Sequence, residues 1–575
     1  MLSKLLVMTF CLGLLSGCLV KKSSTKSAAP DPTSDVTGNN NTNNNPNNSN
    51  GTPGPDPLEV HAWHLNNTGQ SAFAANGGTA GEDINIGQVR AAGVNGSGVL
   101  VAVSDNGVQI AHEDLAANIL NGASKNYDLA APHFGDPTPS GDVGHGTMVS
   151  GIIAARGDNS LGSLGVAPNA SLAGLRYIGA AVTTSIMIDQ ANGVFDIFNY
   201  SYGAYSCIFS PASSFLIQQL KFGSESLRGG LGSLYVKAAG NEYIGLTSDC
   251  FPNQEEEDVR FYFGNANLEE DHSYPYQVVV GALNARGTSA TYSTPGSSLW
   301  LSAPGGDFGV TNPAIVTTDL MGCSLGNSKG SATANDFENG SSDNPNCNYT
   351  STMNGTSSAT PITSGVIALM LSANPNLTQR DVKFILASTA SKVDPTRGVT
   401  GHPVNSNLTG HDYQMGWITN GAGFNFHNWY GFGGVNADAA VAMAQNYNVN
   451  LGTMTESTSD SGTLALAVPD NSATGVSHGI NIVNGKIIDA IQIELSVDHS
   501  FIGDLGVELT SPSMTKSILM NINSGISGNG ITNKILLSNA FFGESSAGLW
   551  TLKIVDGAAA DEGTLTNWKI LVYGH

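Results

Sequence analysis

The chain has 575 residues, which is enough for more than one domain. Charged residues make up only 12% of it, and 46 acidic residues against 23 basic ones give a formal net charge of −23. This acidic balance argues against nucleic acid as a partner, because binding phosphate requires a basic surface. The low charge content and 70 glycines are typical of an exported, turn-rich protein and not of a helical cytosolic one.

The N-terminus, MLSKLLVMTFCLGLLSGC, is predicted to be an export signal. Its apolar stretch follows a lysine and is too short for a good membrane span. Small residues lead directly to Cys18, which resembles the signal of bacterial lipoproteins. We therefore expect a signal peptide over residues 1–17 and a lipid on Cys18. Since Leu19 is not acidic, the same resemblance implies the outer membrane; an ordinary secretory signal with an incidental Cys18 is the alternative.

Residues 18–55 are rich in Asn, Ser and Pro and contain almost no large apolar side chains. Such a segment cannot repay the entropy of ordering, so we expect a flexible tether. Between residue 56 and about residue 450, short apolar strands such as 99–103, 234–238 and 277–282 alternate with helical segments. This alternation predicts an α/β domain with a mostly parallel sheet flanked by helices, and residues 361–371 are predicted to be a core helix.

From residue 455 to the C-terminus the pattern changes. Segments such as 488–497, 505–509, 549–555 and 565–572 alternate apolar and polar residues and are separated by turn sequences. Half-buried antiparallel strands have this pattern, so a separate β-sandwich is predicted.

The chain contains six cysteines, of which Cys11 and Cys18 belong to the signal. Cys207, Cys250, Cys323 and Cys347 remain, and an even number in an exported chain indicates disulfides. Three pairings are possible. We prefer Cys207–Cys250 and Cys323–Cys347; the spacing fits no zinc motif.

Three residues in the α/β region stand at the edges of predicted elements. Asp105 ends the strand VAVSD, His145 in GHGT opens a helix, and Ser357 in NGTSSATP opens the apolar core helix. Each alone would be interpreted as a cap, a structural side chain or a turn. Together they supply the carboxylate, base and nucleophile of serine catalysis, in the chain order of subtilisin.

The phrases around these residues resemble the subtilisin-like serine peptidases and, among them, the kexin-like proprotein convertases. The matching phrases, in order, are DPLEVHAWHLNNTGQ, GVLVAVSDNGVQIAHEDL, GHGTMVSGIIAA, GVAPNA, AAGNE, SAPGG, NGTSSATP and HNWYGFGGVNADAAV. DHSFIGDLGVELTSPS and GLWTLKIVDGAAADEGTLTNWKI resemble the P domain of that family. The resemblance implies a subtilisin-like peptidase domain over residues 56–450 and a jelly-roll-like P domain over residues 455–575.

The resemblance also implies roles. Asp105 would orient His145, and His145 would act as general base and then general acid for the nucleophile Ser357. Asn241 in AAGNE would donate to the oxyanion together with the Ser357 N–H; its alternative interpretation is a plain turn residue. Ser358 would be a variable position, since neighbours on a helix point about 100° apart.

Substrate is expected to pair as an added strand with Ser201, Tyr202 and Gly203. The convertases line their subsites with carboxylates, but the matching positions Asn106, Ala181 and Ser206 are neutral here. Asp142 alone keeps a carboxylate. The acidic runs 255–258 and 269–271 either supply further acidity or form a solvated face. A preference for basic residues at the cleavage site is thus left open.

The family resemblance further implies a structural calcium ion, and hard oxygen ligands suit Ca²⁺. Its ligands would be Asp56, Asp114, the Asn159 side chain, and the backbone carbonyls of Arg156, Leu161 and Ser163. The alternative is that Asp114 merely caps a helix.

The convertases also carry a folding prodomain, whereas the segment before Asp56 has no foldable pattern. We expect folding to rely on an external partner or on the P domain. The function expected is therefore that of a lipid-anchored serine endopeptidase acting on proteins or peptides. The alternatives are a catalytically silent binding or adhesion lipoprotein and a carbohydrate-binding C-terminal domain.

Overall fold

The computed structural model describes residues 54–203, 208–245, 262–330, 332, 334–397, 408–524 and 526–575. The expected signal peptide, the lipid site Cys18, the pair Cys207 and Cys250, and Ser206 lie outside the described residues. Within the described part, no helix combines the length and the apolar character needed to cross a membrane.

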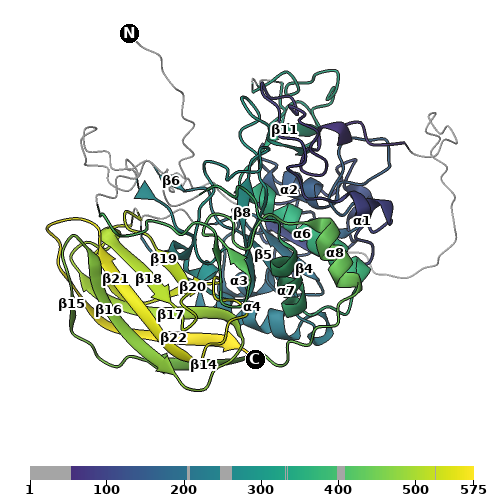
Figure 1. Cartoon of the computed structure of the whole chain (residues 1–575). Coiled ribbons are helices and arrows are strands. Elements are labelled where there is room, and N and C mark those ends of the chain that lie inside the picture. The colour runs from purple at the N-terminus through teal and green to yellow at the C-terminus, as the bar shows by residue number, and fades with distance from the viewer. Residues whose placement is uncertain are drawn as a thin grey trace, which may run out of the picture. The chain divides into compact units, whose positions relative to one another are not determined.

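Seven of the strands described before residue 305 form a parallel sheet with the order β2-β3-β1-β4-β5-β8-β9. Figure 1 labels β4, β5 and β8 of this sheet. Its members are β1 (Leu100–Asp105), β2 (Lys125–Asn126), β3 (Ser171–Arg176), β4 (Ile197–Tyr200), β5 (Leu234–Ala238), β8 (Gln277–Leu283) and β9 (Leu301–Pro304). Three of these strands match the predicted ones within two residues at each end. The expected α/β class is confirmed.

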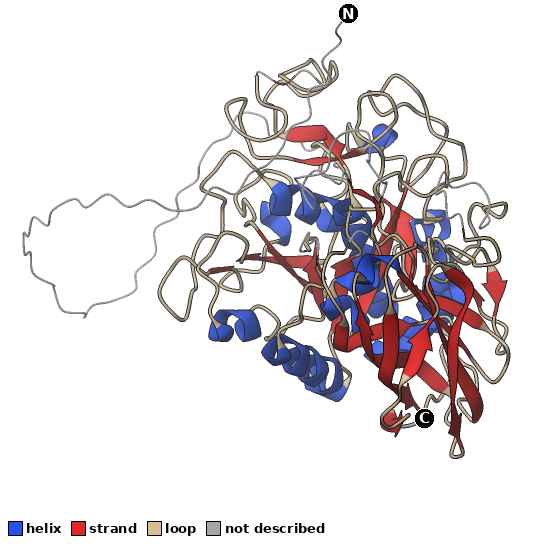
Figure 2. Cartoon of the chain, turned by 90° about the vertical axis from the view of Figure 1, so that its left-hand side faces the viewer, coloured by secondary structure: helices blue, strands red, loops and turns tan. Residues whose placement is uncertain are grey.

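Helices cover both faces of this sheet (Figure 2). The α-helices are α1 (Gly87–Ala91), α2 (His145–Ala154), α3 (Thr184–Asp189), α4 (Ser214–Ser226), α6 (Thr356–Ala373), α7 (Gln379–Thr389) and α8 (Ala437–Gln445). Alternate strand residues point to opposite faces. In β1, Val101 and Val103 pack in one core cluster with residues of α2 and α6, whereas Ala102 packs in a second cluster with residues of α3 and α4.

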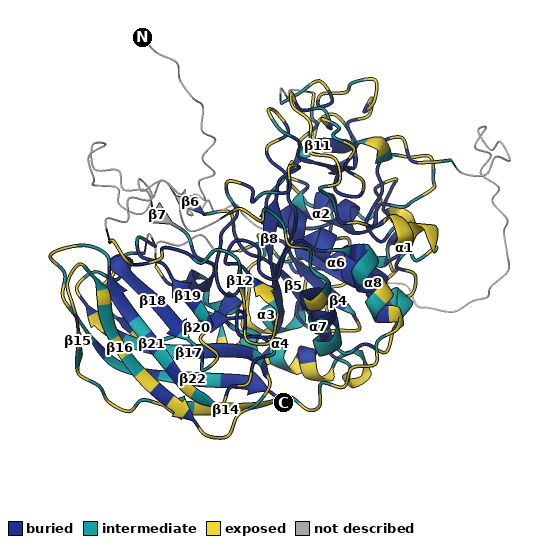
Figure 3. Ribbon diagram, viewed as in Figure 1, coloured by how far each residue is buried: buried dark blue, intermediate teal, exposed yellow. Residues whose placement is uncertain are grey.

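Helix α6 is buried along its length from Thr356 to Leu371 (Figure 3), which explains why its sequence is apolar on most faces. It begins at Thr356, one residue before the predicted opening at Ser357 and five residues before the apolar run that starts at Pro361. Pro361 therefore lies inside the helix, where its missing N–H leaves the carbonyl of Ser357 without its usual partner.

The α/β region also contains two-stranded antiparallel sheets. In these, β6 (Ile244–Gly245) pairs with β7 (Tyr262–Phe263), β10 (Ile315–Thr318) with β11 (Tyr349–Met353), and β12 (Ile418–Thr419) with β13 (Asn425–Phe426). A disulfide joins Cys323 to Cys347 in the loop between β10 and β11. This confirms one of the two predicted pairings.

The C-terminal region is made of two antiparallel sheets. One contains β14 (Thr455–Asp460), β15 (Leu466–Val468), β17 (Ile488–His499), β20 (Ile531–Ser538) and β22 (Gly563–Gly574). The other contains β16 (Ser472–Ile482), β18 (Leu505–Thr510), β19 (Lys516–Met520) and β21 (Gly548–Asp556). Residues of both sheets, including the fully buried Trp550 and Trp568, share one hydrophobic core, as a sandwich requires.

Residues 264–273, which we call the junction segment, connect the two regions by hydrogen bonds. The fully buried Asn267 donates its side-chain amide to the carbonyls of Leu519 (3.0 Å) and Leu537 (3.1 Å) and accepts from the Leu537 N–H (3.0 Å). Asn265 donates to Asn521 (2.9 Å), and Gln492 donates to the carbonyl of Ser273. The sandwich is thus held by directional polar contacts as well as by apolar packing.

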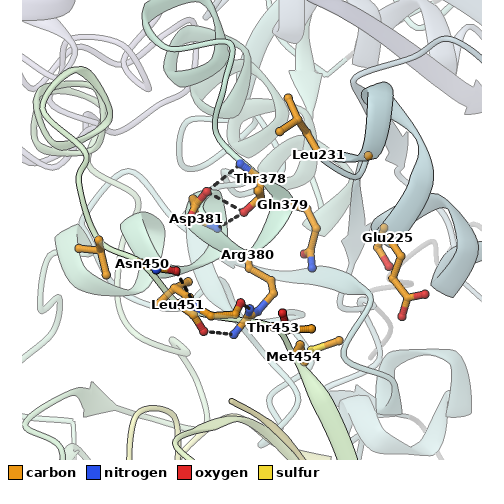
Figure 4. Close-up of a pocket in the computed structure, with 14 residues that line it drawn as sticks. Glu225, Leu231, Thr378, Gln379, Arg380, Asp381, Asn450, Leu451, Thr453 and Met454 are labelled. Carbon is orange, nitrogen blue, oxygen red and sulfur yellow. Dashed lines mark hydrogen bonds between the residues drawn. The ribbon is translucent and has the colours of Figure 1, made fainter.

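A second polar contact centres on Arg380 in α7 (Figure 4). Its guanidinium donates to Asp489 of β17 (2.6 Å) and to the carbonyls of Gly452 (2.6 Å) and Leu451 (3.2 Å). It also lies 3.0 Å from Nδ1 of His575, the last residue of the chain. One side chain therefore ties α7 to the linker, the sandwich and the C-terminus.

We expect Arg380→Ala to lower the melting temperature by several degrees. The substitution leaves two carbonyls and the partly buried Asp489 without their donor. Lys221→Ala is the matched control, because its 3.5 Å ion pair with Glu456 also joins the two regions but is exposed. That change should shift the melting temperature by about 1 °C or less. Differential scanning fluorimetry measures the melting temperatures of both variants. Equal shifts in the two variants would show that Arg380 contributes no more than an exposed ion pair.

Candidate active site

The carboxyl ends of β1, β4 and β5 bring the predicted site residues to one edge of the sheet. Asp105 is the last residue of β1, Ser201 follows β4, and Asn241 lies three residues beyond β5. Neighbouring parallel strands end at the same edge, and this edge is where open α/β sheets place their sites.

Asp105 and His145 form a short polar pair. Both carboxylate oxygens of the fully buried Asp105 lie 2.9 Å from Nδ1 of His145, the first residue of α2. Asn106 braces the pair, since its side chain accepts from the Gly146 N–H (3.0 Å) and donates to the Val143 carbonyl (2.9 Å). The predicted orientation of the histidine by this aspartate has the geometry it needs.

The carboxylate accepts, so Nδ1 of His145 carries a proton and Nε2 is the ring nitrogen that can take up another. Burial lowers the pKa of His145, but the charge of Asp105 and its hydrogen bond outweigh burial and raise that pKa above 6.5. The pair therefore favours the imidazolium form, the state that a general base passes through.

Ser357 occupies the first turn of α6 and is 9% exposed. Its hydroxyl donates to the backbone carbonyl of Ser201 (2.9 Å) and not to His145. In return, the Ser201 hydroxyl donates to the Ser357 carbonyl (2.9 Å). That carbonyl is available because Pro361 supplies no N–H, so the proline allows this reciprocal contact.

Asn241 is exposed at the same edge and has a fixed amide orientation. Its Oδ1 accepts from the backbone N–H of Thr356 (2.8 Å) and from the Thr356 hydroxyl (3.0 Å). Among the described residues, its Nδ2 has no hydrogen-bond acceptor and is available as a donor. Gly355 is required beside it, because its φ is +102° and a β-carbon would lie 3.3 Å from Nδ2.

The start of α6 offers a second donor. The N–H groups of Thr356, Ser358 and Ala359 have acceptors, whereas that of Ser357 has none among the described residues. Asn241 Nδ2 and the Ser357 N–H can therefore bind one anionic oxygen, helped by the partial positive charge of the helix N-terminus.

The 201–203 segment is held in place by a buried ion pair that was not predicted from the sequence. Lys237 in β5 is 1% exposed, donates to the Tyr202 carbonyl (2.6 Å) and pairs with Glu269 (2.9 Å). Burial lowers the pKa of Lys237, but Glu269 and Asp271 outweigh burial and raise it. The lysine in the apolar strand LYVKA was the available signal, since a buried ammonium needs a carboxylate.

Glu269 also lies against the 201–203 segment. A β-carbon on Gly203 would come within 2.7 Å of Glu269 Oε2. The acidic run 269–271 is therefore not a solvated face: Glu269 is mostly buried and ion-paired.

Asp142 keeps its carboxylate at the surface, but it is already paired. Lys329 lies 3.0 Å from it and lowers its pKa, and both side chains are exposed. An incoming cation would compete with Lys329 for this carboxylate.

The structure brings together the side chains of the predicted ion site. Asp56 and Asp114 are buried, and Asn159 donates its amide to Asp114 (2.8 Å). Asp56 accepts from the backbone N–H of Asn159 (3.0 Å), and Asp114 accepts from that of Ser163 (3.1 Å). Among the described residues no lysine or arginine pairs with either carboxylate, and burial raises the pKa of Asp114 to about 7. Two neighbouring buried carboxylates of this kind fit a divalent cation. The predicted carbonyl ligands, Arg156, Leu161 and Ser163, belong to the same loop.

Comparison with known proteins gives two family matches. The subtilase family matches residues 96–433, and the proprotein convertase P-domain matches residues 488–572.

Two relatives align with most of the chain. An extracellular serine protease of Aeromonas sobria is 36% identical over 543 residues, covering 88% of this chain and 85% of the relative. Neuroendocrine convertase 2 of Rattus norvegicus is 27% identical over 542 residues, covering 90% of this chain and 74% of the relative.

The crystal structure of the A. sobria serine protease superposes with a TM-score of 0.81 at 31% identity, over 93% of this chain and 99% of that one. A second crystal structure shows the A. sobria protease in complex with a chaperone; it has a TM-score of 0.81 at 32% identity and covers 91% of this chain and 96% of that one.

Asp105→Asn is expected to lower the pKa of His145 below its ordinary value of 6.5, because burial then acts without the compensating charge. The measurement is an NMR titration of the ring protons, with His145→Gln used to assign the signal. Asp142→Asn, three residues before the histidine and fully exposed, is the control and should leave the titration unchanged. An unchanged titration in Asp105→Asn would contradict the pairing.

Proposed function

This chain belongs to the subtilase family of serine proteases, and we propose that it cleaves peptide bonds with Asp105, His145 and Ser357. The observation that carries the proposal is the 2.9 Å Asp105–His145 pair at the sheet edge where Ser357 also lies. Asn241 would complete the site as the donor to the oxyanion.

The contact between Ser357 and Ser201 suggests how substrate starts the reaction. A substrate strand pairing with the 201–203 segment offers an N–H to the Ser201 carbonyl, the same acceptor that holds the Ser357 hydroxyl. Displaced from this carbonyl, the hydroxyl turns to Nε2 of His145. Substrate binding would thereby free the nucleophile and present it to its base.

In the chemical step, His145 takes the proton of Ser357 Oγ as this oxygen bonds to the substrate carbonyl carbon. The carbonyl oxygen becomes an anion held by Asn241 Nδ2 and the Ser357 N–H; in subtilisin one such donor is worth about 3–4 kcal/mol. His145 then gives its proton to the leaving amine, and the C–N bond breaks. Water releases the acyl group by the same steps, with His145 again as base.

We expect Ser357→Ala to abolish cleavage and labelling by a fluorophosphonate probe, which reacts only with an activated serine. Ser358→Ala is the matched control. The Ser358 hydroxyl is buried and has no hydrogen-bond partner in the described part of the chain, so its loss should leave both readouts near wild type. The reverse pattern would assign the nucleophile to Ser358. No labelling of the folded wild-type protein would exclude this mechanism.

Basic residues at the cleavage site would be attracted by two carboxylates near the 201–203 segment and His145. Glu269 lies beneath Gly203, and Asp142 stands three residues before His145. Each already has an internal cation, Lys237 and Lys329 respectively. We therefore propose a basic preference that is weakened by these internal lysines.

The Lys329 ammonium is exposed and can be removed without opening the core. Lys329→Ala should increase kcat/KM for substrates with Lys or Arg near the cleaved bond and leave neutral substrates unchanged. Profiling on a diverse peptide library measures this. Lys329→Ala combined with Asp142→Asn should lose the gain. An equal rise for neutral substrates would exclude competition for Asp142.

Subtilases commonly bind structural calcium, and the buried carboxylates of Asp56 and Asp114 fit such an ion. We propose that these residues hold it with Asn159 and the carbonyls of Arg156, Leu161 and Ser163. The ion would neutralise two buried negative charges and fix the loop that carries them.

Calcium should therefore raise the melting temperature, and chelation should lower it. At a free concentration 100 times Kd, the stabilisation would be about 2.7 kcal/mol. Asp114→Asn should abolish the response, whereas Asp158→Asn, an exposed carboxylate in the same loop, should retain it. A response that survives in Asp114→Asn would place the ion elsewhere.

The sequence supports export, a lipid on Cys18, a tether over residues 18–55 and attachment to the outer membrane. The mass of the mature N-terminal peptide tests the lipid. The chaperone bound to the A. sobria protease supports an external folding partner for this chain as well. Recovery of fully active protein from expression of this chain alone would argue against it.

A further inference from the structure

The junction segment carries a cluster of side chains that the proposed mechanism does not use. One ligand atom from each of Glu269, Asp271 and His272 lies within 4.8 Å of the other two. His272 is fully buried in a short helix, η6 (Glu270–Ser273). Carboxylates often cluster without an ion, so the hydrogen bonding of His272 decides whether this cluster can bind a metal.

His272 presents a bare nitrogen to this cluster. Its Nδ1 lies 2.9 Å from the carbonyl of Ala266, which can only accept, so Nδ1 carries the proton. In the neutral ring, Nε2 then carries a lone pair. Nε2 is buried and has no hydrogen-bond partner among the residues that the structure describes, and the same holds for Asp271 Oδ1.

Unpartnered buried acceptors are costly, at about 1–3 kcal/mol each. A cation would satisfy both at once. A ring N–H donated to a backbone carbonyl, with the other nitrogen free, is also how metal-binding histidines are oriented.

Glu269 completes the cluster. Its Oε2 lies 3.6 Å from His272 Nε2, close to the roughly 3.3 Å that separates two ligands of a tetrahedral ion bound at about 2.0 Å. Its other oxygen, Oε1, is engaged by Lys237. The carboxylate can therefore bind an ion with one oxygen while keeping the lysine on the other.

We propose that Glu269, Asp271 and His272 bind a divalent metal ion of the zinc class, with water in a fourth position. Zn²⁺ takes both imidazole nitrogen and carboxylate oxygen as ligands, and the imidazole favours it over Ca²⁺ and Mg²⁺. The Asp56 and Asp114 site offers oxygen alone and selects Ca²⁺ instead.

The place of the ion gives it a role. On one side, Asn265 and Asn267 of the junction segment bond to the P-domain. On the other side, Glu269 reaches Gly203 and, through Lys237, the Tyr202 carbonyl. The ion would fix the segment between these two contacts. It would also offset negative charge beside the substrate-pairing segment.

Metal binding is measured by titrating Co²⁺ into the full chain in the Ser357→Ala background, with excess Ca²⁺ to fill the oxygen-only site. This background prevents self-digestion and makes the result independent of the proposed cleavage. Wild-type ligands should give one equivalent of Co²⁺ with visible d–d absorption and no near-ultraviolet thiolate band, displaced by Zn²⁺. The missing thiolate band excludes binding at cysteine.

His272→Gln and Glu269→Gln should each weaken this binding by at least about 100-fold, the upper range seen for disturbing a residue behind a ligand. Glu270→Gln is the matched control. The Glu270 carboxylate accepts from the Ala212 N–H (3.2 Å) and lies 4.0 Å from Lys534, so its substitution should change the affinity less than threefold.

The absence of binding at 100 µM Co²⁺ and Zn²⁺ would overturn the proposal, and so would binding that persists in His272→Gln. Should one variant fail to fold, the other still decides, because Glu269 and His272 are tested separately.

Discussion

The parallel pairing of β1 with β4 is the constraint on which the site depends. Val101, Val103 and Asp105 lie on one face of β1 because side chains alternate along a strand. The two valines pack against α2 and α6, so the aspartate two residues further on faces the first turns of the same helices. Those turns carry His145 and Ser357. A shift of one residue in β1 would turn the aspartate to the opposite face.

A buried charge connects this edge to the rest of the molecule. Lys237 lies in an apolar strand in the middle of the sheet. Its ammonium is stabilised by Glu269 and the Tyr202 carbonyl, with Asp271 nearby. Both the position of the 201–203 segment and the path of the junction segment follow from the need to satisfy this one group. The same junction segment binds the P-domain through Asn267. The 201–203 segment, the core of the sheet and the contact with the P-domain therefore all depend on the pairing of Lys237 with Glu269.

Local patterns predicted much of this molecule. The strand 234–238 was predicted to the residue, and Asp105, His145 and Ser357 were placed at element edges, because apolar runs and glycine turns mark those edges. Ser357 was placed at the start of α6, one residue from the observed start at Thr356. Pro361 lies inside this helix, and the Ser201 hydroxyl satisfies the carbonyl that the proline leaves free. The partner of Asp142 could not be predicted, because Lys329 is 187 residues away and nothing local points to it. The pairing of Lys237 with Glu269 depended on the path of a loop in the same way.

Asn267 also bears on how such proteins are recombined. Its amide fills acceptors that are 252 and 270 residues away, on strands of the other domain. If the sandwich were fused to a different subtilase at the linker near residue 450, the carbonyls of Leu519 and Leu537 would lose the donor that Asn267 supplies. The unit that must be transferred together is therefore discontinuous in sequence. It comprises residues 264–273 and the C-terminal strands, which no single continuous gene fragment encodes without the residues between them.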